Sequence, residues 1–432
     1  MNIQDKYFDV YPKIVPSDKS TVITIRDKYN QSFIKDDTEY EVRYYPLERY
    51  SHISEYKFQD VKIVKPVNGT LQIEQYFKAE QEHVLEIQQK DNENPAYRKS
   101  FRFYSLNEDL FLRKPYKGDL HMHTHYSDGK ESPAYVTASC RKIGLDFMAI
   151  TDHEQYYPSI ESQEVFKAAH TDLLICRGEE VHPINNPVHM INFGGSFSVN
   201  EMIKENKDQY LEEVKKIEAG LSEIKDEDSK YQCASCTWCF DKIRQGGGLG
   251  IFSHPYWQVR EGYYISETVT SYLLEKQPYD ALEIIGGYYK HEEESNTLQI
   301  ARYHEERSKG RKVPIVGVSD AHGCETGELF GWFYSIVFAP SLEQQEIIGS
   351  IKDLYSVAVE AIPGETIRTY GPFRYVKYAS FLIREVMPLH DALCFEEGTA
   401  MLEYISGQPT ANDRLKSFKG RTESLYNKLW AK

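Results

Sequence analysis

The segment Asp119-Leu120-His121-Met122-His123-Thr124-His125-Tyr126-Ser127-Asp128-Gly129 decides the fold class and the chemistry that we expect for this chain. Residues 118–123 have the pattern of a short strand that enters a polar loop. Because successive side chains of a strand point to opposite faces, His121 and His123 project to the same side. Two imidazoles at one strand end suit a single metal ion, and Asp128 in the loop offers a carboxylate oxygen as a further ligand.

Further strands follow this segment, and most of them alternate with helices. The predicted strands cover residues 118–123, 146–151, 172–178, 188–193, 248–253, 279–285 and 313–319. Such alternation is typical of α/β proteins, and seven strand–helix units imply a parallel barrel related to the eight-fold barrel. In barrels of this kind the chemistry gathers at the carboxyl ends of the strands.

Metal-binding residue types recur at these predicted strand ends. They occur in Thr151-Asp152-His153, Gly178-Glu179-Glu180, Val188-His189, Ser253-His254-Pro255 and Ser319-Asp320-Ala321-His322. Asp320 and His322 repeat the i, i+2 spacing of His121 and His123, so each pair shares one face of its strand. A single histidine is more often a structural residue than a ligand. Six histidines at the strand ends of one barrel, together with carboxylates, instead predict a metal centre.

Two further domains flank the predicted barrel. Residues 1–114 carry short segments in which apolar and polar residues alternate, at 21–25, 40–45, 71–77, 83–87 and 101–104. This pattern predicts an antiparallel β-sandwich of immunoglobulin-like type. The barrel then occupies residues 115–358, with a charged helical insertion at about 197–230. Residues 359–432, with apolar residues at helical spacing in 373–387 and 392–405, predict a helical C-terminal extension.

Composition limits the classes of protein that fit the chain. Hydrophobic residues make up 41% of 432 residues, and no apolar run approaches the ~18 residues of a membrane span, so we expect a soluble protein without membrane contact. The formal charge of −15 argues against an extended nucleic-acid partner, which requires clustered Lys and Arg. Residues 1–6 lack a secretion signal and seven scattered cysteines fit a reducing compartment, so we expect a cytoplasmic location. The oligomeric state stays open.

The motifs together resemble a known family. His121-x-His123 with Ser127-Asp128-Gly129, Thr151-Asp152-His153, Gly178-x-Glu180, His189, His254-Pro255 and Asp320-Ala321-His322 are similar to the motifs of the PHP family (polymerase and histidinol phosphatase). They stand in the family's order over roughly residues 116–360. The resemblance implies a distorted seven-stranded barrel that holds two or three divalent metal ions.

The resemblance also implies which residues hold each ion. The first ion would be held by His121, His123, Glu180 and Asp320. The second would be held by Glu180 as a bridging ligand with His189 and His254. The third would be held by Asp128, His153 and His322. The choice of Glu180 over Glu179 rests on the Gly-x-Glu spacing of the family and stays open.

The β-rich segment before the first motif adds a narrower resemblance. It is similar to the branch of PHP metallohydrolases that includes carbaryl-hydrolysing enzymes, in which a β-sandwich precedes the barrel. Some members of that branch cleave carbamate or carboxyl esters. The resemblance therefore implies an ester substrate as an alternative to a phosphate ester.

The ligand set indicates how a reaction would proceed. Three acidic ligands bring about −3 and three divalent ions +6, so the centre would attract anions although the chain is acidic. Water that bridges two ions about 3.5–4 Å apart would be deprotonated near neutral pH and act as the nucleophile. The mixed imidazole and carboxylate ligands admit Zn, Mn or Fe.

These features predict a metal-dependent hydrolase. Our first hypothesis is a phosphoesterase that cleaves a small phosphate monoester or diester. The second is a metallohydrolase of carbamate or carboxyl esters. The third, a non-catalytic binding module stabilised by metal, is disfavoured by the full ligand set, because structural metal sites are usually closed and mononuclear.

Other residues near the predicted mouth of the barrel are weaker candidates. For catalysis we name Asp152, which would orient a ligand imidazole or take a proton, His125 as a proton shuttle, and Arg177 as an anion contact. For substrate binding we name Lys130, Arg260, Tyr256 and Lys290. His182 lies beside a ligand, and Glu283 ends the sixth predicted strand. Cys233, Cys236 and Cys239 resemble half of a metal motif, but their spacing places them on one helix face, which favours burial.

Overall fold

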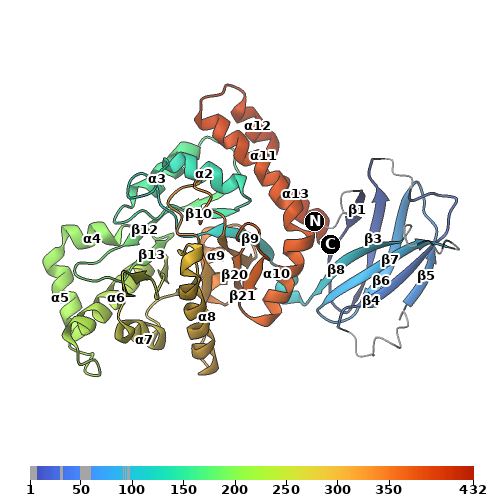
Figure 1. Cartoon of the computed structure of the whole chain (residues 1–432). Coiled ribbons are helices and arrows are strands. Elements are labelled where there is room, and N and C mark those ends of the chain that lie inside the picture. Colours follow the sequence, from blue (N-terminus) through green and yellow to red (C-terminus); the bar gives the residue numbers. More distant parts are fainter. Residues whose placement is uncertain (1–6, 30–32, 49–59, 91, 93, 95–97) are drawn as a thin grey trace. The chain divides into compact units, whose positions relative to one another are not determined.

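The computed structural model describes residues 7–29, 33–48, 60–90, 92, 94 and 98–432 (Figure 1). The chain divides into two compact units. Unit 1 comprises residues 1–114, 377–390 and 420–432, and unit 2 comprises residues 115–376 and 391–419. The residues after 358, which we expected as a separate extension, are thus shared between the two units. Residues 1–6, on which the expected absence of a secretion signal rests, lie outside the described residues.

Unit 1 contains two β-sheets. The first has the order β1 (Phe8–Tyr11), β3 (Lys19–Asp27) and β6 (Thr70–Phe77), all antiparallel. The second has the order β2 (Ile14–Pro16), β8 (Lys99–Leu106), β7 (Glu82–Gln89), β4 (Tyr40–Pro46) and β5 (Asp60–Val64). Only the β2–β8 pair of these described pairings is parallel. Helices α1 (Glu108–Phe111) and α13 (Arg421–Leu429) also belong to this unit.

Both sheets of unit 1 contribute to one hydrophobic core. In β4, Tyr40, Val42 and Tyr44 are buried, and the residues between them are partly exposed. This alternation is the one seen in the sequence, and it follows from the two-residue period of a strand. The core joins these side chains with residues of the other sheet, among them Ile23, Ile25, Leu71 and Ile73.

Unit 2 is a mixed α/β unit, also with two main sheets. One sheet has the order β11 (Leu174–Cys176), β10 (Phe147–Ala149), β9 (Lys114–Asp119), β19 (Phe333–Ala339), β20 (Ser356–Glu360) and β21 (Arg368–Tyr370). The other has the order β12 (Gly178–Val181), β13 (Met190–Phe193), β14 (Leu249–Phe252), β17 (Ala281–Ile285) and β18 (Ile315–Gly317). Each predicted strand overlaps an observed strand. β19, β20 and β21 are additional to the prediction, and β12 shares only Gly178 with the predicted strand 172–178.

The two sheets of unit 2 meet just beyond the carboxyl ends of β9, β10 and β18. Parallel bridges pair Met122 with Ala321 and His153 with Glu180. The Asp320 N–H donates to the His121 carbonyl at 3.0 Å, which adds to the first of these contacts. The segments that follow these strands are therefore held side by side, although they are up to 200 residues apart in the sequence.

The expectation of wholly parallel strands is wrong at β13, which runs antiparallel to both β12 and β14. The connection from His182 to His189 between β12 and β13 is short and contains no helix. Antiparallel neighbours can be joined by such a short loop, whereas parallel neighbours need a crossover of a dozen or more residues.

Helices connect the strands of unit 2 and continue into the C-terminal segment, of which residues 377–390 and 420–432 belong to unit 1. They are α2 (Pro133–Lys142), α3 (Tyr157–Phe166), α4 (Val199–Glu205), α5 (Lys207–Glu218), α6 (Glu227–Gln245), α7 (Glu267–Lys276), the 3-10 helix η4 (Lys290–Glu292), α8 (Glu293–Ser308), α9 (Gln344–Lys352), α10 (Phe373–Glu385), α11 (Met387–Ile405) and α12 (Ala411–Phe418). A two-stranded hairpin, β15 (Gln258–Val259) and β16 (Gly262–Tyr263), precedes α7. Within the described residues, no helix combines the length and apolar character needed to cross a membrane.

Local signals explain several helix boundaries. Ser132 accepts a hydrogen bond from the Tyr135 N–H and caps α2, with Pro133 in the first turn. The predicted helical insertion at about 197–230 contains α4, α5 and the start of α6, with breaks at Asn206 and at 219–226. Cys233, Cys236 and Cys239 are buried in the core on α6, which agrees with the packing interpretation.

A buried histidine in unit 1 makes stability depend on pH. His83 is fully buried between the Tyr44 hydroxyl (2.9 Å) and the Ser105 hydroxyl (2.6 Å), and burial lowers the pKa of His83 to about 3. Below pH ~6.5 the unfolded chain gains a proton at this residue that the folded chain does not, so stability falls as the pH falls. We expect His83→Gln to reduce this loss by roughly 1 kcal/mol per pH unit between pH 6 and pH 4, measured by urea unfolding. His170→Gln, at an exposed site, is the control; equal pH dependence in both variants would contradict the expectation.

Candidate metal centre

The nine predicted ligands lie at one edge of the sheets of unit 2. They follow the carboxyl ends of strands or lie in adjacent loops: His121, His123 and Asp128 after β9, His153 after β10, Glu180 within β12, His254 after β14, and Asp320 and His322 after β18, with His189 directly before β13. His189 reaches the same edge because β13 is antiparallel. The first residue of β13, Met190, pairs with Val181 at the end of β12 and with Phe252 at the end of β14.

The Glu180 carboxylate lies at the centre of this group. Its two oxygens lie between 2.6 and 3.5 Å from one nitrogen of each of five imidazoles, those of His121, His123, His153, His189 and His254. The carboxylate is fully buried, and neither oxygen accepts a hydrogen bond from the described residues. A buried carboxylate without such partners is costly unless a cation lies beside it.

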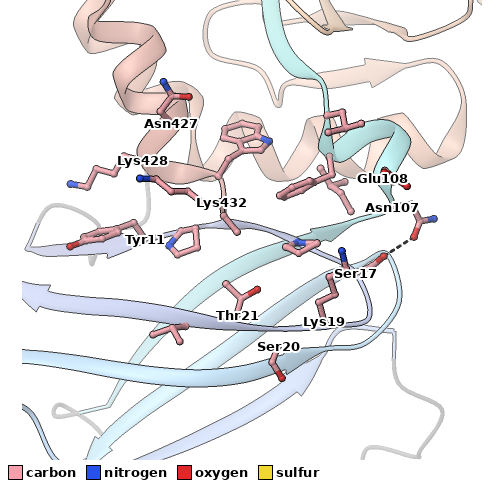
Figure 2. A pocket seen from close by; sticks show the side chains of 18 of the residues that line it. Tyr11, Ser17, Lys19, Ser20, Thr21, Asn107, Glu108, Asn427, Lys428 and Lys432 are labelled. Atoms are coloured by element: carbon pink, nitrogen blue, oxygen red, sulfur yellow. Dashed lines mark hydrogen bonds between the residues drawn. The ribbon is translucent and has the colours of Figure 1, made fainter.

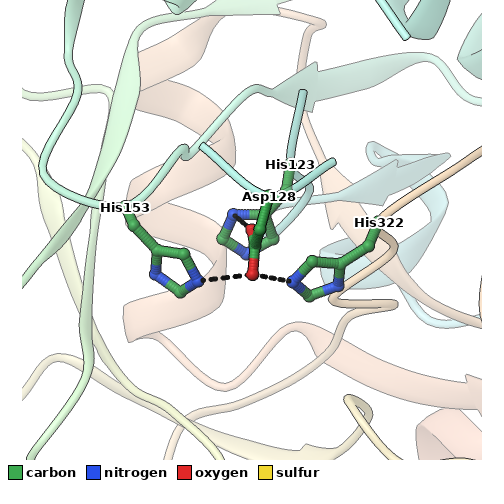
Figure 3. Close-up of side chains that lie close together, drawn as sticks. All are labelled: His123, Asp128, His153 and His322. Atoms are coloured by element: carbon green, nitrogen blue, oxygen red, sulfur yellow. Dashed lines mark ion pairs between the residues drawn. The ribbon is translucent and has the colours of Figure 1, made fainter. Parts of the chain in front are cut away.

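Two aspartates complete the group. Asp320 Oδ1 lies 3.1 Å from His121 Nε2 and 2.9 Å from His123 Nε2. Asp128 Oδ2 lies between two rings, 3.4 Å from His153 Nε2 and 3.3 Å from His322 Nε2 (Figure 3). Asp320 thus contacts both imidazoles of the segment after β9, and Asp128 brings together imidazoles from two different loops.

These contacts define four overlapping sets whose donor atoms lie within 4.8 Å of one another. The sets are His123, Asp128, His153 and His322; His121, His123 and Glu180; His121, His254 and Asp320; and His153, Glu180, His182 and His189. Imidazole nitrogen and carboxylate oxygen are the donors that zinc, manganese and iron accept. Besides Glu180, the buried His121 Nε2 and His254 Nδ1 also lack a hydrogen-bond partner among the described residues. The residues present therefore fit a cluster of divalent ions.

The charges of the group stabilise one another. Burial alone would raise the pKa values of Glu180 and Asp320, but the nearby imidazoles, His121 among them, hold both well below their ordinary values. Burial alone would lower the pKa of His121, but the charges of Asp320 and Glu180 raise it well above its ordinary value. Both carboxylates are therefore ionised at neutral pH, which is the form that binds a cation.

The ligand imidazoles are oriented through their other nitrogen. His121 Nδ1 faces Glu283 at 3.3 Å, His123 Nδ1 faces the Ser127 hydroxyl at 3.4 Å, and His322 Nδ1 faces the Asp320 carbonyl at 2.8 Å. These contacts favour the tautomer in which Nε2 is free to bind a metal ion. The carboxylate behind a ligand imidazole is thus Glu283, and Asp152 contacts none of these rings in the described structure.

Asp152 instead fixes the loop that carries Asp128. It is fully buried and accepts hydrogen bonds from the Thr124 N–H (2.7 Å), the Thr124 hydroxyl (2.6 Å) and the Ser127 hydroxyl (2.5 Å). The same loop closes tightly at Gly129, where a Cβ atom would lie 2.6 Å from the main chain of His123. This geometry favours a positioning role for Asp152 over proton transfer.

Glu179 and Glu180 have separate surroundings. Glu179 accepts hydrogen bonds from the Ser198 hydroxyl, the Val199 N–H and the side-chain amides of Asn192 and Asn200, all at 2.6 to 3.0 Å. Because adjacent strand residues face opposite sides, Glu180 then points toward the imidazoles. The geometry thus places Glu180, and not Glu179, in the group.

Strand ends in the group also have uncommon backbone geometry. His254 has φ of +28° and Asp320 has φ of +50°, in the left-handed region that residues other than glycine seldom adopt. Such conformations cost free energy and persist where the surrounding structure fixes them, commonly at functional sites. The two residues also belong to one donor set with His121.

The structure adds one residue that the motifs do not include. His182 lies directly after β12, with Nε2 2.9 Å from His153 Nδ1 and 3.6 Å from Glu180 Oε2. The i, i+2 spacing of Glu180 and His182 was the available signal, since it repeats that of His121 and His123.

The other candidates lie outside the donor sets. His125 is exposed, with Nδ1 3.2 Å from the Glu131 carbonyl, and the Arg177 Nε–H donates to Gln163 at 3.2 Å. The Tyr256 hydroxyl donates to Glu267 at 3.3 Å, and Lys290 lies 3.7 Å from Glu365. Lys130 and Arg260 are exposed. Their proposed roles stay predictions.

A pocket of about 400 Å³ opens over the group. Its floor consists of Asp128, His153, His189, His254, Asp320 and His322, and its other walls of Trp257, Gly287, Tyr289, Glu292 and Leu329. None of the described residues that line it is Lys or Arg. Four predicted substrate contacts, Lys130, Arg260, Tyr256 and Lys290, are also absent from this lining.

A larger groove lies in unit 1 (Figure 2). It has a volume of about 1090 Å³, and its lining includes Tyr11, Lys19, Asn107 and Lys428. Among the described residues that line it there is no histidine or cysteine, and Glu108 is the one acidic residue. The groove therefore offers neither a metal ligand set nor an acid–base pair, and its size alone indicates no chemistry.

Residues 119–237 match the family model described as the PHP domain. This match confirms the family resemblance for that part of the chain. His254, Asp320 and His322 lie beyond the matched segment.

Known proteins share shorter or more distant similarity. Over 53 residues the chain is 47% identical to the DNA polymerase/3'-5' exonuclease PolX of Bacillus subtilis (strain 168), a match that covers 12% of this chain and 9% of that protein. A two-domain protein from Bacteroides vulgatus ATCC 8482, containing a predicted PHP-like metal-dependent phosphoesterase, is 18% identical with a TM-score of 0.39, over 57% of this chain and 65% of that chain. A candidate metal-dependent phosphoesterase from Bifidobacterium adolescentis ATCC 15703 is 19% identical with a TM-score of 0.34, over 48% of this chain and 87% of that chain.

The contacts of Asp152 lead to a prediction that separates its two roles. We expect Asp152→Ala to weaken metal binding about 10–100-fold, because the Asp128 loop loses its anchor, while Asp152→Asn keeps an acceptor and weakens it less. Calorimetric titration with Zn²⁺ and Mn²⁺ measures both affinities. If Asp152 were instead the catalytic base, both variants would lose hydrolysis equally and bind metal like the unchanged protein.

Proposed function

We propose that this chain is a metal-dependent hydrolase that acts on a small phosphate monoester or diester. The observation that carries the proposal is the buried Glu180 carboxylate, whose oxygens face five imidazole nitrogens without a hydrogen-bond partner among the described residues. A group that served only to stabilise the fold would satisfy these atoms with hydrogen bonds. An open pocket above the group gives a substrate access to it.

The proposed ligands are the nine residues of the motifs, in up to three sites. Glu180 would bridge, with His121, His123 and Asp320 on one side and His189 and His254 on the other. Asp128, His153 and His322 would form the third set. Bound divalent ions, Zn, Mn or Fe, would supply Lewis acidity toward the phosphoryl oxygens and activate water. Elemental analysis of the purified protein would identify the metal.

The protein's own residues would shape the reaction in three ways. Asp152 and Asp119 would hold the ligand loops: Asp119 accepts hydrogen bonds from the His121 N–H (3.3 Å) and the Ser319 N–H (3.1 Å). Glu283 would orient the His121 ring. Trp257 and Leu329, which line the pocket with the ligands, would exclude water from it.

We further propose that seven strands of unit 2 form a distorted (β/α)7 barrel. The order β12-β13-β14-β17-β18 is continuous, and the bridges at His153–Glu180 and Met122–Ala321 would link its two edges to β10 and β9. β9 and β10 also pair directly. The two sheets of unit 1, which share one core, support an antiparallel sandwich for that unit.

The lining of the pocket favours a substrate with a single anionic group. With no Lys or Arg among its described lining residues, the positive charge that binds an anion would come from the metal ions. Glu292 adds a negative charge, which would repel a second phosphate. The same observation supports the second candidate, a carbamate or carboxyl ester hydrolase, because a neutral ester needs no cationic side chain.

Removal of metal or of a ligand tests the proposal. We expect chelator-treated protein to lose hydrolysis and to regain it with Mn²⁺ or Zn²⁺. We expect His121→Ala and Asp320→Ala to lose both bound metal and hydrolysis, because each residue contributes to more than one contact of the cluster. His304→Ala, at an exposed site on α8, is the matched control. Full hydrolysis by metal-free protein would refute the proposal.

A paired substrate panel separates the two candidate reactions. We expect metal-loaded protein to hydrolyse aryl phosphates with one phosphate group faster than the corresponding aryl acetates and carbamates. We also expect a second phosphate on the substrate to lower kcat/KM, because Glu292 would oppose its charge. Preference for the esters over every phosphate would favour the second candidate.

A further inference from the structure

We propose that His182 is a further metal ligand, which binds the ion held by Glu180 and His189. The inference rests on the proposed metal centre but goes beyond the nine residues of the family motifs. It concerns one ion of borderline softness, such as Zn²⁺, since the donors are two imidazoles and one carboxylate.

The position of His182 follows from β12. Glu180 and His182 are two residues apart at the end of this strand, so their side chains point to the same side. The insertion holds this strand end in place. Asn200 in α4 accepts from the His182 N–H at 3.0 Å and donates to the Glu180 carbonyl at 2.9 Å.

The distances bring four donor atoms close to one another. His182 Nε2 lies 3.6 Å from Glu180 Oε2, and the His182 and His189 rings lie 4.1 Å apart between centroids. His189 Nδ1 lies 2.8 Å from Glu180 Oε1. The donor atoms of His153, Glu180, His182 and His189 all lie within 4.8 Å of one another. A single ion can therefore contact several of them.

His153 can serve only one ion of this arrangement. Its Nε2 lies 3.4 Å from Asp128, in the set with His322, whereas its Nδ1 lies 2.6 Å from Glu180. A neutral imidazole offers one unprotonated nitrogen, so binding through Nε2 leaves Nδ1 protonated and unable to bind a second ion. This Nδ1 lies 2.6 Å from Glu180 Oε2 and 2.9 Å from His182 Nε2, so its proton would face Glu180 once His182 binds the ion. The ion beside Glu180 and His189 then needs another nitrogen, and His182 supplies it.

His254 lies between two possible ions: it belongs to a donor set with His121 and Asp320, and its Nε2 lies 3.5 Å from Glu180 Oε1, the oxygen beside His189 Nδ1. With His182 and His189, the ion beside Glu180 would have two histidines and one glutamate even when His254 binds the ion of His121 and Asp320. Such a set leaves a coordination position for water or substrate, as in many zinc hydrolases.

Two variants distinguish a ligand from a hydrogen-bond partner of His153. His182→Gln keeps an oxygen that accepts from His153 Nδ1–H but removes the metal-binding nitrogen, and His182→Ala removes both. His170→Ala, at an exposed site, is the control. Zn²⁺ titration of chelator-treated protein measures the number of sites and their affinities. Circular dichroism of the metal-free proteins confirms that each variant is folded.

We expect both His182 variants to lose one equivalent of Zn²⁺ or to bind it more than about 100-fold more weakly. Loss of a hydrogen bond to a metal ligand would lower the affinity by only about 10–100-fold. Retention of all sites in His182→Gln, with affinities as in the unchanged protein, would overturn the inference. If the unchanged protein binds Zn²⁺ but hydrolyses no ester, the proposed function fails while the role of His182 is still decided. If it binds no Zn²⁺, both proposals fail.

A second measurement needs no variant. His182 retains 23% side-chain exposure, so diethyl pyrocarbonate can reach it in the metal-free protein. We expect Zn²⁺ to protect His182 from this reagent at least tenfold, read by peptide mass spectrometry, and to leave His170 unprotected. Equal modification of His182 with and without Zn²⁺ would overturn the inference.

Discussion

The structure of unit 2 depends on one electrostatic constraint, the burial of the Glu180 carboxylate among imidazoles from different strands. A buried anion without hydrogen bonds is stable only beside positive charge, which protonated imidazoles supply in part and metal ions would supply more fully. The constraint requires the ends of β9, β10, β12, β14 and β18 to meet at one place. Bridges and hydrogen bonds hold several of these strand ends together. His254 and Asp320, at two of the ends, have a left-handed backbone conformation.

A second layer of carboxylates keeps the ligands in position. Asp119 joins the segments of His121 and Ser319, Asp152 fastens the loop of Asp128, and Glu179 binds the start of the helical insertion. These side chains accept hydrogen bonds, whereas neither oxygen of Glu180 does among the described residues. Acidic residues in one small region thus have two distinct kinds of surroundings.

The same surroundings shape the selectivity that we propose. The chain has a formal charge of −15, so a cationic ligand cluster would be the local source of attraction for an anionic substrate. The described walls of the pocket carry aromatic, aliphatic and acidic residues but no cationic ones. An enzyme of this design would recognise the reacting group through metal and the rest of the substrate through shape and apolar contact.

The sequence by itself determined the features that arise from local spacing: the i, i+2 pairs at His121 and His123 and at Asp320 and His322, the overlap of every predicted strand in 115–358 with an observed one, and the match of residues 119–237 to the PHP domain. The tertiary structure alone decided the antiparallel direction of β13, the position of Glu180 and not Glu179 among the imidazoles, the hydrogen bonds of Asp152 to the loop of Asp128 and the approach of His182 to His153. Each of these depends on hydrogen bonds or packing between segments distant in the sequence. Such contacts leave no periodic signal in the chain, because their free energy arises only when the segments meet.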